Sequence, residues 1–155
     1  MKPKQTGRHQ RYKFAFQRLN ESLEEGWLLE AITLEESIIS DRLASALQYK
    51  NEKEGKAQSL NNLIAQARKH LHTEINSLDP ELIALLDKWR VARNKCIHGI
   101  CKLDQDSHSE NAAKSFENNL WTTARDGLVL SNQARTLANR MKEKPNAEAS
   151  GMNQP

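Results

Sequence analysis

Residues 79–99 read DPELIALLDKWRVARNKCIHG, and this stretch carries the start, the apolar face and the end of one α-helix. Asp79 is an N-cap acceptor, Pro80 suits the first helical position, and Glu81 places an acid in the first turn. Gly99 suits the position that follows a helix. At about 100° per residue, one face of the stretch is apolar, and Ile100 directly after the stretch continues it. The residues of this face are Leu82, Leu85, Leu86, Trp89, Cys96, Ile97 and Ile100.

Helical patterning continues on both sides of this stretch. Further helices are expected over about residues 8–25, 27–50, 59–75 and 109–142. Gly26 either ends the first of them or lies within a longer continuous helix. Short connections between long amphipathic helices favour an up-and-down bundle. We therefore expect an all-α, up-and-down bundle of four to five helices.

The expected bundle occupies residues 8–142 as one domain, since 155 residues suffice for a single core. Residues 1–7 are expected to form a disordered basic lead. Residues 143–155, which are polar and contain two prolines, are expected to form a disordered tail.

The choice of hydrophobic residues also favours helices. The chain has 19 Leu and 16 Ala but only 2 Val, and aromatic residues make up 5% of it. Strands prefer β-branched and aromatic side chains, whereas helices prefer Leu, Ala, Glu, Lys and Gln. This composition argues against an all-β fold and against a parallel α/β sheet.

Several classes of protein are excluded by what the sequence lacks. No run approaches the roughly 18 apolar residues of a membrane span, and no apolar segment of a secretion signal follows the basic N-terminus. The two cysteines, Cys96 and Cys101, suit reduced thiols in a cytoplasm. Together with His98 they supply too few ligands for structural zinc. No glycine-rich phosphate loop is present, and no cluster of carboxylates accompanies residues 93–98 to bind Mg²⁺. We therefore expect no metal and no cofactor.

Three charged residues fall on faces that the pattern assigns to packing. Arg93 lies in the centre of the apolar face of residues 79–99. Glu35 and Arg42 lie inside the broad apolar arc of residues 27–50. Burying an unpaired charge costs several kcal/mol, so each of these side chains needs a partner, a wet cleft or an interface. They form either a functional polar pocket, with Glu35 bridging Arg42 or Arg93, or a structural ion network.

Arg93 also belongs to a group of three polar residues. Asn94 and His98 are separated by four positions, so their side chains can meet on one helix face, with Arg93 beside them. Histidine titrates near neutral pH and can move protons, whereas the arginine fork can hold a phosphate. An amide such as that of Asn94 can orient either group.

The stretch RNKCIH at residues 93–98 resembles the signature of the HEPN superfamily, an arginine followed after four to six residues by a histidine. The resemblance implies a helical bundle, commonly a homodimer, in which two such motifs face each other in a cleft. Many members are metal-independent endoribonucleases that act as toxins, in phage defence or in RNA processing. A toxin of this kind would have an antitoxin as a partner protein.

The resemblance assigns roles to the three motif residues. His98 would be the acid and base, Arg93 would clamp the phosphate, and Asn94 would support the pair. Attack of the ribose 2′-hydroxyl on the adjacent phosphate would leave a 2′,3′-cyclic phosphate. Glu35 and Arg42 come from the helix faces and not from the resemblance. Some family members lack nuclease activity, so a non-catalytic module that binds a partner protein or a nucleotide is the alternative.

The first expected helix is basic. Arg8, Arg11, Lys13 and Arg18 all lie on it. Such residues form either an ordinary solvated face or part of a surface that binds RNA.

Overall fold

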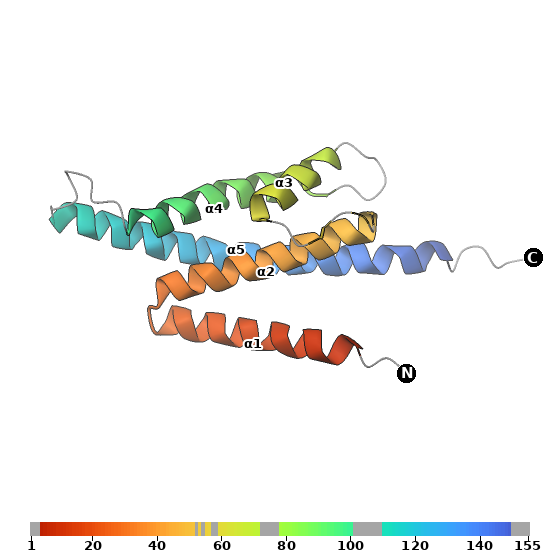
Figure 1. Cartoon of the computed structure of the whole chain (residues 1–155), viewed down its shortest axis with the longest axis horizontal. Coiled ribbons are helices and arrows are strands. Elements are labelled where there is room, and N and C mark those ends of the chain that lie inside the picture. Colours follow the sequence, from red (N-terminus) through yellow and green to blue (C-terminus); the bar gives the residue numbers. More distant parts are fainter. Residues whose placement is uncertain are drawn as a thin grey trace, which may run out of the picture. The chain divides into compact units, whose positions relative to one another are not determined.

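The computed structural model describes residues 4–51, 53, 55–56, 59–71, 78–100 and 110–149, and in these residues it holds five α-helices and no strand. The helices are α1 (Lys4–Glu24), α2 (Leu28–Lys50), α3 (Leu60–Lys69), α4 (Pro80–Gly99) and α5 (Glu110–Ala149) (Figure 1). The expected all-α helical bundle is confirmed.

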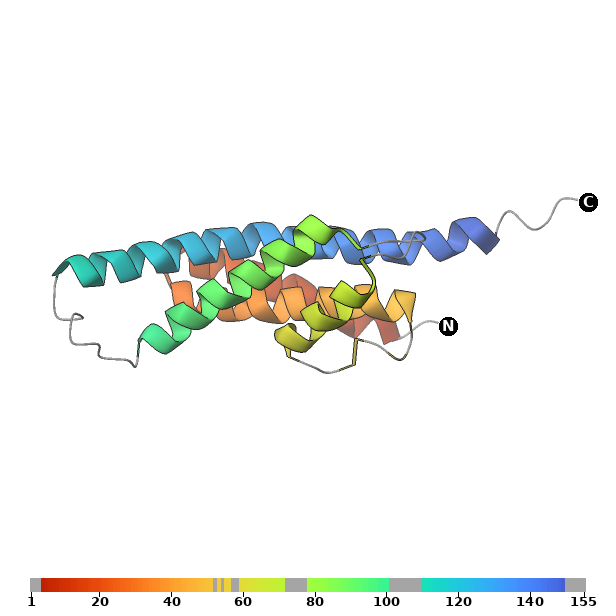
Figure 2. The same cartoon turned by 90° about the horizontal axis from the view of Figure 1, so that it is seen from above.

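The helices form two compact units, and α2, α4 and α5 each contribute to both. Unit 1 comprises Met1–Ile38 and Trp89–Leu128, and unit 2 comprises Ile39–Lys88 and Val129–Pro155. In unit 1, α1 and the first part of α2 run in opposite directions, as do the second part of α4 and the first part of α5 (Figures 1 and 2). Unit 1 holds the motif at residues 93–98 and Glu35, whereas unit 2 holds Arg42.

The hairpin of α1 and α2 turns at Gly26, which settles the alternative that the sequence left open. Gly26 has a positive φ of 75° and follows the end of α1. The Trp27 N–H donates to the Ser22 carbonyl at 2.8 Å, and the Gly26 N–H donates to the Leu23 carbonyl at 3.4 Å. These two bonds define a Schellman motif, in which glycine takes the left-handed conformation at low cost.

The start of α4 is as the sequence predicts. The side chain of Asp79 accepts hydrogen bonds from the Glu81 N–H at 3.0 Å and the Leu82 N–H at 3.4 Å. Pro80 is the first helical residue. The cap satisfies two of the N–H groups that a helix start leaves without partners, so the register of α4 is set from this end.

The other helix ends differ in part from expectation. Helix α1 begins at Lys4, within the segment expected to be a disordered lead, and α5 continues to Ala149, within the segment expected to be a disordered tail. Helix α3 ends at Lys69, where the chain tightens into i→i+3 bonds such as that of the His70 N–H to the Ala67 carbonyl at 3.0 Å. Gly99 is the last residue of α4 and does not have the positive φ of a C-cap glycine.

Each unit has its own apolar core. The core of unit 1 is built from Leu19, Leu28, Ala31, Ile32, Ile38, Trp89, Cys96 and Ala124. The core of unit 2 includes Ile39, Leu43, Leu47, Leu63, Ile64, Leu78, Ile83, Leu86, Leu137 and Met141. Within the described part of the chain, no helix is long and apolar enough to cross a membrane.

Candidate functional site

The motif lies on the last turns of α4, and its arginine points inward as the pattern predicts. The side chain of Arg93 is 21% exposed. One terminal nitrogen, Nη1, donates to Asn94 Oδ1 at 2.7 Å, and the other, Nη2, pairs with Glu36 Oε2 of α2. The Nε atom is buried and has no hydrogen-bond partner among the described residues. Arg93 is therefore held between its neighbour on α4 and a carboxylate of α2.

The partner of Arg93 is Glu36 and not Glu35, so the predicted bridge from Glu35 to Arg93 or Arg42 is wrong. Both carboxyl oxygens of Glu35 are buried without a hydrogen-bond partner among the described residues. Glu36 lies one position further along α2, which rotates its side chain by about 100° toward Arg93. One signal could have found it: Glu36 is four residues after Ile32 and three before Ile39, at the edge of the apolar arc.

Arg42 belongs to unit 2, where its guanidinium pairs with Asp41. The Nε atom donates to Asp41 Oδ2 at 2.9 Å. The structure thus gives Arg42 a partner next to it on its own helix.

Glu35 occupies a closed position in the core of unit 1. Its residue has no exposed surface, and a methyl group built on Gly127 of α5 would lie 1.9 Å from Glu35 Oε2. The same position is 2.9 Å from the indole nitrogen of Trp89, which itself donates to the Thr123 carbonyl at 2.9 Å. Burial, and secondarily the charge of Asp126, raise the pKa of Glu35 to about 9. Glu35 is consequently a neutral carboxylic acid at pH 7.

His98 lies in the last turn of α4 and is exposed. No hydrogen bond joins its imidazole to Arg93 or Asn94 in the described structure. Helix α4 continues through Gly99, and His98 follows Arg93 by five residues. At about 100° per residue, the two side chains are therefore separated by about 140° around the helix axis. Within one chain, the structure thus joins Arg93 to Asn94 and leaves His98 open to solvent.

Cys96 is a free, buried thiol on the packing face of α4. Its Sγ lies 3.5 Å from Thr123 Oγ1 of α5. Cys96 thus packs in the core of unit 1, without the exposed, electropositive surroundings that a reactive thiol needs. Cys101 lies outside the described residues. No cluster of three or more His, Cys, Asp or Glu side chains suited to a metal ion occurs in the described ranges.

A shallow groove of about 590 Å³ lies in unit 2, between the first turns of α4 and the second part of α5. Its lining mixes charged, polar and apolar groups, including Asp79, Glu81, Leu85, Val129, Asn132 and Arg140. None of the residues of the motif lines this groove, so it gives no support to the chemistry predicted for them.

The ion pair of Arg93 leads to a testable prediction about stability. Glu36→Gln is expected to lower the free energy of unfolding by about 1.5 kcal/mol, because a half-buried guanidinium loses its charged partner. The matched control is Lys114→Gln, which removes the cation of an exposed pair with Glu110 and should cause no measurable loss of stability. Urea unfolding measures both. Equal effects of the two substitutions would contradict a structural role for the Arg93 pair.

Comparison of the chain with protein-family models, with curated protein sequences and with solved structures finds no match.

Proposed function

We propose that the chain is a metal-independent endoribonuclease of HEPN type that acts as a homodimer. The observation that carries the proposal is the motif itself, placed on the last turns of one helix. Its histidine is exposed to solvent, and its arginine is only half-buried and held by Asn94 and Glu36. An arginine in this setting is oriented before any phosphate arrives, which lowers the cost of binding one.

RNA supplies the nucleophile in this reaction. The 2′-oxygen attacks the adjacent phosphorus, its proton passes to a base, and the 5′-oxygen leaves with a proton from an acid. His98 can serve as that base or acid because an imidazole ring can both accept and donate a proton. Arg93 would stabilise the additional negative charge on the phosphate oxygens in the transition state. The products are a 2′,3′-cyclic phosphate and a 5′-hydroxyl.

The dimer is part of the proposal because one chain offers only one histidine and one arginine for the transfer of a phosphoryl group. The helix separates Arg93 from His98 by about 140° around its axis. A two-fold axis beside α4 would bring a second motif to the same phosphate and double the set. Light scattering should therefore show a dimer at tens of micromolar protein. A monomer with full activity would contradict this part of the proposal.

The test is cleavage of a labelled RNA by the purified chain in EDTA. We expect cleavage to persist in the chelator and the matching DNA to stay intact, since DNA lacks the 2′-hydroxyl. His98→Ala should lower the rate by about 10²–10⁴-fold, the usual contribution of one acid–base group. Arg93→Lys keeps the charge and loses the two-pronged contact, so it should also be slow.

The matched control is His70→Gln, which changes a histidine outside the motif. Circular dichroism and urea unfolding establish that each variant is folded. If the wild type leaves a broad panel of RNAs uncut, or if His98→Ala cuts as fast as the wild type, the nuclease proposal fails.

The second candidate is a non-catalytic helical module that binds a partner protein or a nucleotide. The ion pair of Arg93 with Glu36 favours it, because the guanidinium is already engaged and must open to contact a phosphate. On this reading, the motif stabilises the α2–α4 contact in unit 1. The assay above separates the two functions: the module predicts no cleavage by wild type or variants, together with the loss of stability in Glu36→Gln.

A further inference from the structure

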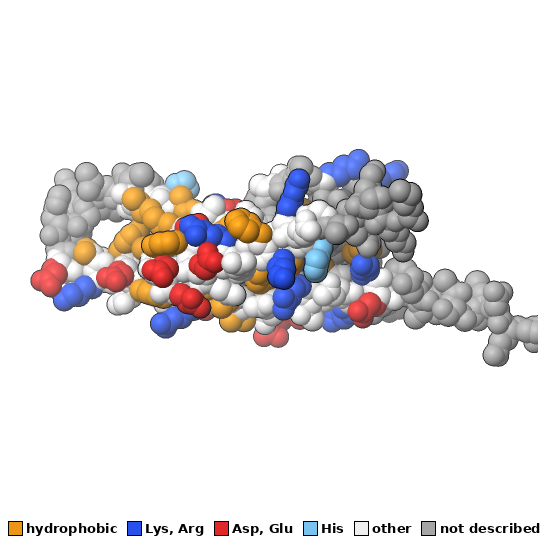
Figure 3. All heavy atoms as spheres, turned by 90° about the horizontal axis from the view of Figure 1, so that it is seen from below, with side chains coloured by type: hydrophobic (Ala, Val, Ile, Leu, Met, Phe, Trp, Pro, Cys, Tyr) orange, Lys and Arg blue, Asp and Glu red, His pale blue; other side chains and the backbone are white. Residues whose placement is uncertain are grey.

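The positive charge of the chain is concentrated at its start. The first 20 residues contain six Lys and Arg and no Asp or Glu, although the whole chain has a net charge of only +3. The rest of the chain is therefore net acidic. Most of this basic segment forms α1, the helix onto which Figure 3 looks. In that view blue Lys and Arg side chains lie beside a pale-blue histidine to the right of the middle, and most of the red acidic side chains lie to the left, with some blue ones among them.

The same helix exposes an aromatic ring. Phe14 is 68% exposed, more than any other large hydrophobic side chain recorded in the described residues. The inward face of α1 is occupied by other residues: Leu19 is fully buried, and the rings of Tyr12 and Phe16 meet edge to face at 5.1 Å. Phe14 thus adds nothing to the core of unit 1. Burying a phenylalanine stabilises a fold, and this chain forgoes that contribution at position 14.

Basic side chains surround this ring on the helix surface. Arg11 lies one turn before Phe14 and Arg18 one turn after it, so both are its direct neighbours. Lys13 is adjacent in sequence and exposed. Arg11 and Lys13 form no ion pair with any described residue, so their charges remain available to an outside partner.

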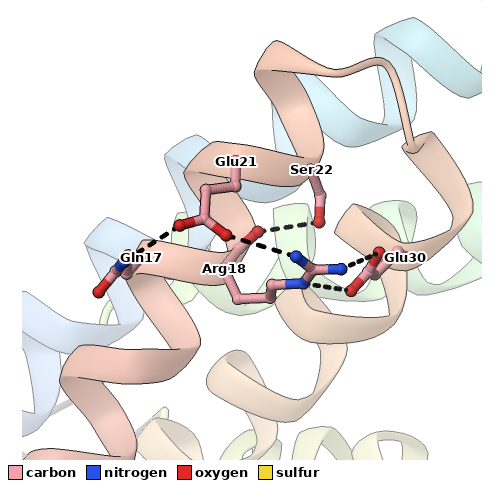
Figure 4. Close-up of polar contacts among 5 residues, drawn as sticks. All are labelled: Gln17, Arg18, Glu21, Ser22 and Glu30. Carbon is pink, nitrogen blue, oxygen red and sulfur yellow. Dashed lines mark hydrogen bonds and ion pairs between the residues drawn. The ribbon is translucent and has the colours of Figure 1, made fainter.

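The two acidic groups near this surface, Glu21 and Glu30, are both engaged by Arg18. Arg18 Nε donates to Glu30 Oε1 at 2.7 Å, and its Nη1 contacts Glu21 Oε2 at 3.4 Å (Figure 4). Gln17 also donates to Glu21, at 3.0 Å. The guanidinium of Arg18 stacks 4.9 Å from the centre of the Trp27 ring, which fixes its plane. Arg18 therefore offsets one of the two negative charges, and Arg11 and Lys13 add two further positive charges around Phe14.

We propose that α1 binds single-stranded nucleic acid, with one base stacked on Phe14 and the neighbouring phosphates held by Arg11 and Lys13. Stacking on an aromatic ring combined with a basic surface is the usual chemistry by which proteins hold unpaired strands. Paired bases are buried in the duplex and do not offer a free face to the ring. The proposal does not depend on the proposed function, since a strand can be bound here without being cut.

A membrane surface is the other anionic partner to consider, and the geometry of α1 does not favour it. A helix that lies in a lipid interface presents a broad apolar face outward. Helix α1 turns its apolar face into the core of unit 1 and shows one ring among polar and basic side chains. That surface matches a base and its phosphates better than it matches acyl chains.

Fluorescence anisotropy with a labelled oligothymidylate of about 15 nucleotides tests the proposal at low salt. This DNA probe has no 2′-hydroxyl, so binding is measured without cleavage, and failure of the nuclease proposal would leave this result unaffected. Phe14→Ala should weaken binding by roughly 5- to 150-fold, whereas Phe14→Trp should retain it. Arg11→Gln with Lys13→Gln should reduce the salt dependence of binding.

The matched control is Val129→Ala, which truncates another exposed apolar side chain and should bind like the wild type. The same sequence as a duplex should bind more weakly than the single strand. Binding by Phe14→Ala equal to that of the wild type would overturn the proposal, as would equal affinity for duplex and single strand. So would binding to phosphatidylserine vesicles in place of the oligonucleotide.

Discussion

Gly127→Ala is expected to lower the free energy of unfolding by about 1–3 kcal/mol, the usual cost of adding volume to a packed core. The new methyl group would lie 1.9 Å from Glu35 Oε2, 2.5 Å from its Cδ and 2.9 Å from the indole nitrogen of Trp89. Glu35 has no exposed surface, so its carboxyl has no solvent to move into, and Trp89 is held by the Thr123 carbonyl. Urea unfolding followed by circular dichroism measures the change.

The expected loss of stability is opposite to the usual effect of this substitution, because alanine normally stabilises a helix relative to glycine by about 1 kcal/mol. Gly7→Ala in α1 is the matched control: nothing lies within 4 Å of its added methyl group, so it should be neutral or stabilising. Placing Gly127→Ala in a Glu35→Ala background should remove most of the penalty, because the shortened side chain leaves room. A stabilising Gly127→Ala would show that the close approach of α2 and α5 at this point is wrong.

The helical fold could be predicted because its signals are local. Residues 79–99 carry their own cap, proline and apolar period, and the structure places Asp79 and Pro80 where these signals put them. The sequence around Gly26 does not decide its conformation, because a glycine can lie inside a helix or end one. The structure ends α1 there through the pair of bonds to Ser22 and Leu23. That choice depends on how α1 and α2 pack, which no local signal contains.

The inward positions of the candidate site could be predicted, but not their partners. Periodicity assigned Arg93 and Glu35 to packing faces, and both are inward in the structure. Pairing depends on the rotation of α2 relative to α4, and one residue step of about 100° exchanges Glu35 for Glu36. A single sequence does not contain that rotation. The roles assigned to Asn94 and His98 stay predictions.

Two features of the sequence carried information about packing that its helical pattern did not reveal. A glycine inside a strongly helical stretch costs stability, so Gly127 signals a close approach, and the structure supplies it in Glu35. The distribution of charge likewise marks α1, since a net charge of +3 hides a basic first segment and an acidic remainder. In both cases the signal is a departure from what the local element would prefer.

The last prediction concerns Glu35 and pH. Burial raises the pKa of Glu35 to about 9 in the folded chain, from an ordinary value of 4.5. Between these two values the folded state keeps a proton that the unfolded state releases, so stability falls as pH rises. The slope approaches about 1.4 kcal/mol per pH unit within this window. Below pH 4.5 the stability that protonated Glu35 contributes is fully present, and above about pH 9 it is lost.

Glu35→Gln removes this titration while keeping the shape of the side chain. We therefore expect the variant to gain stability relative to the wild type as the pH is raised from about 5 to about 8, by roughly 1.4 kcal/mol per unit at most. Any cost of burying the amide of the variant is the same at every pH. It therefore does not affect the measurement, which is how the difference in free energy of unfolding between variant and wild type changes with pH. Glu117→Gln, which alters an exposed carboxylate of α5, is the control and should run parallel to the wild type. Parallel curves for Glu35→Gln would instead mean that Glu35 is paired or hydrated in solution and ionises near its ordinary pKa.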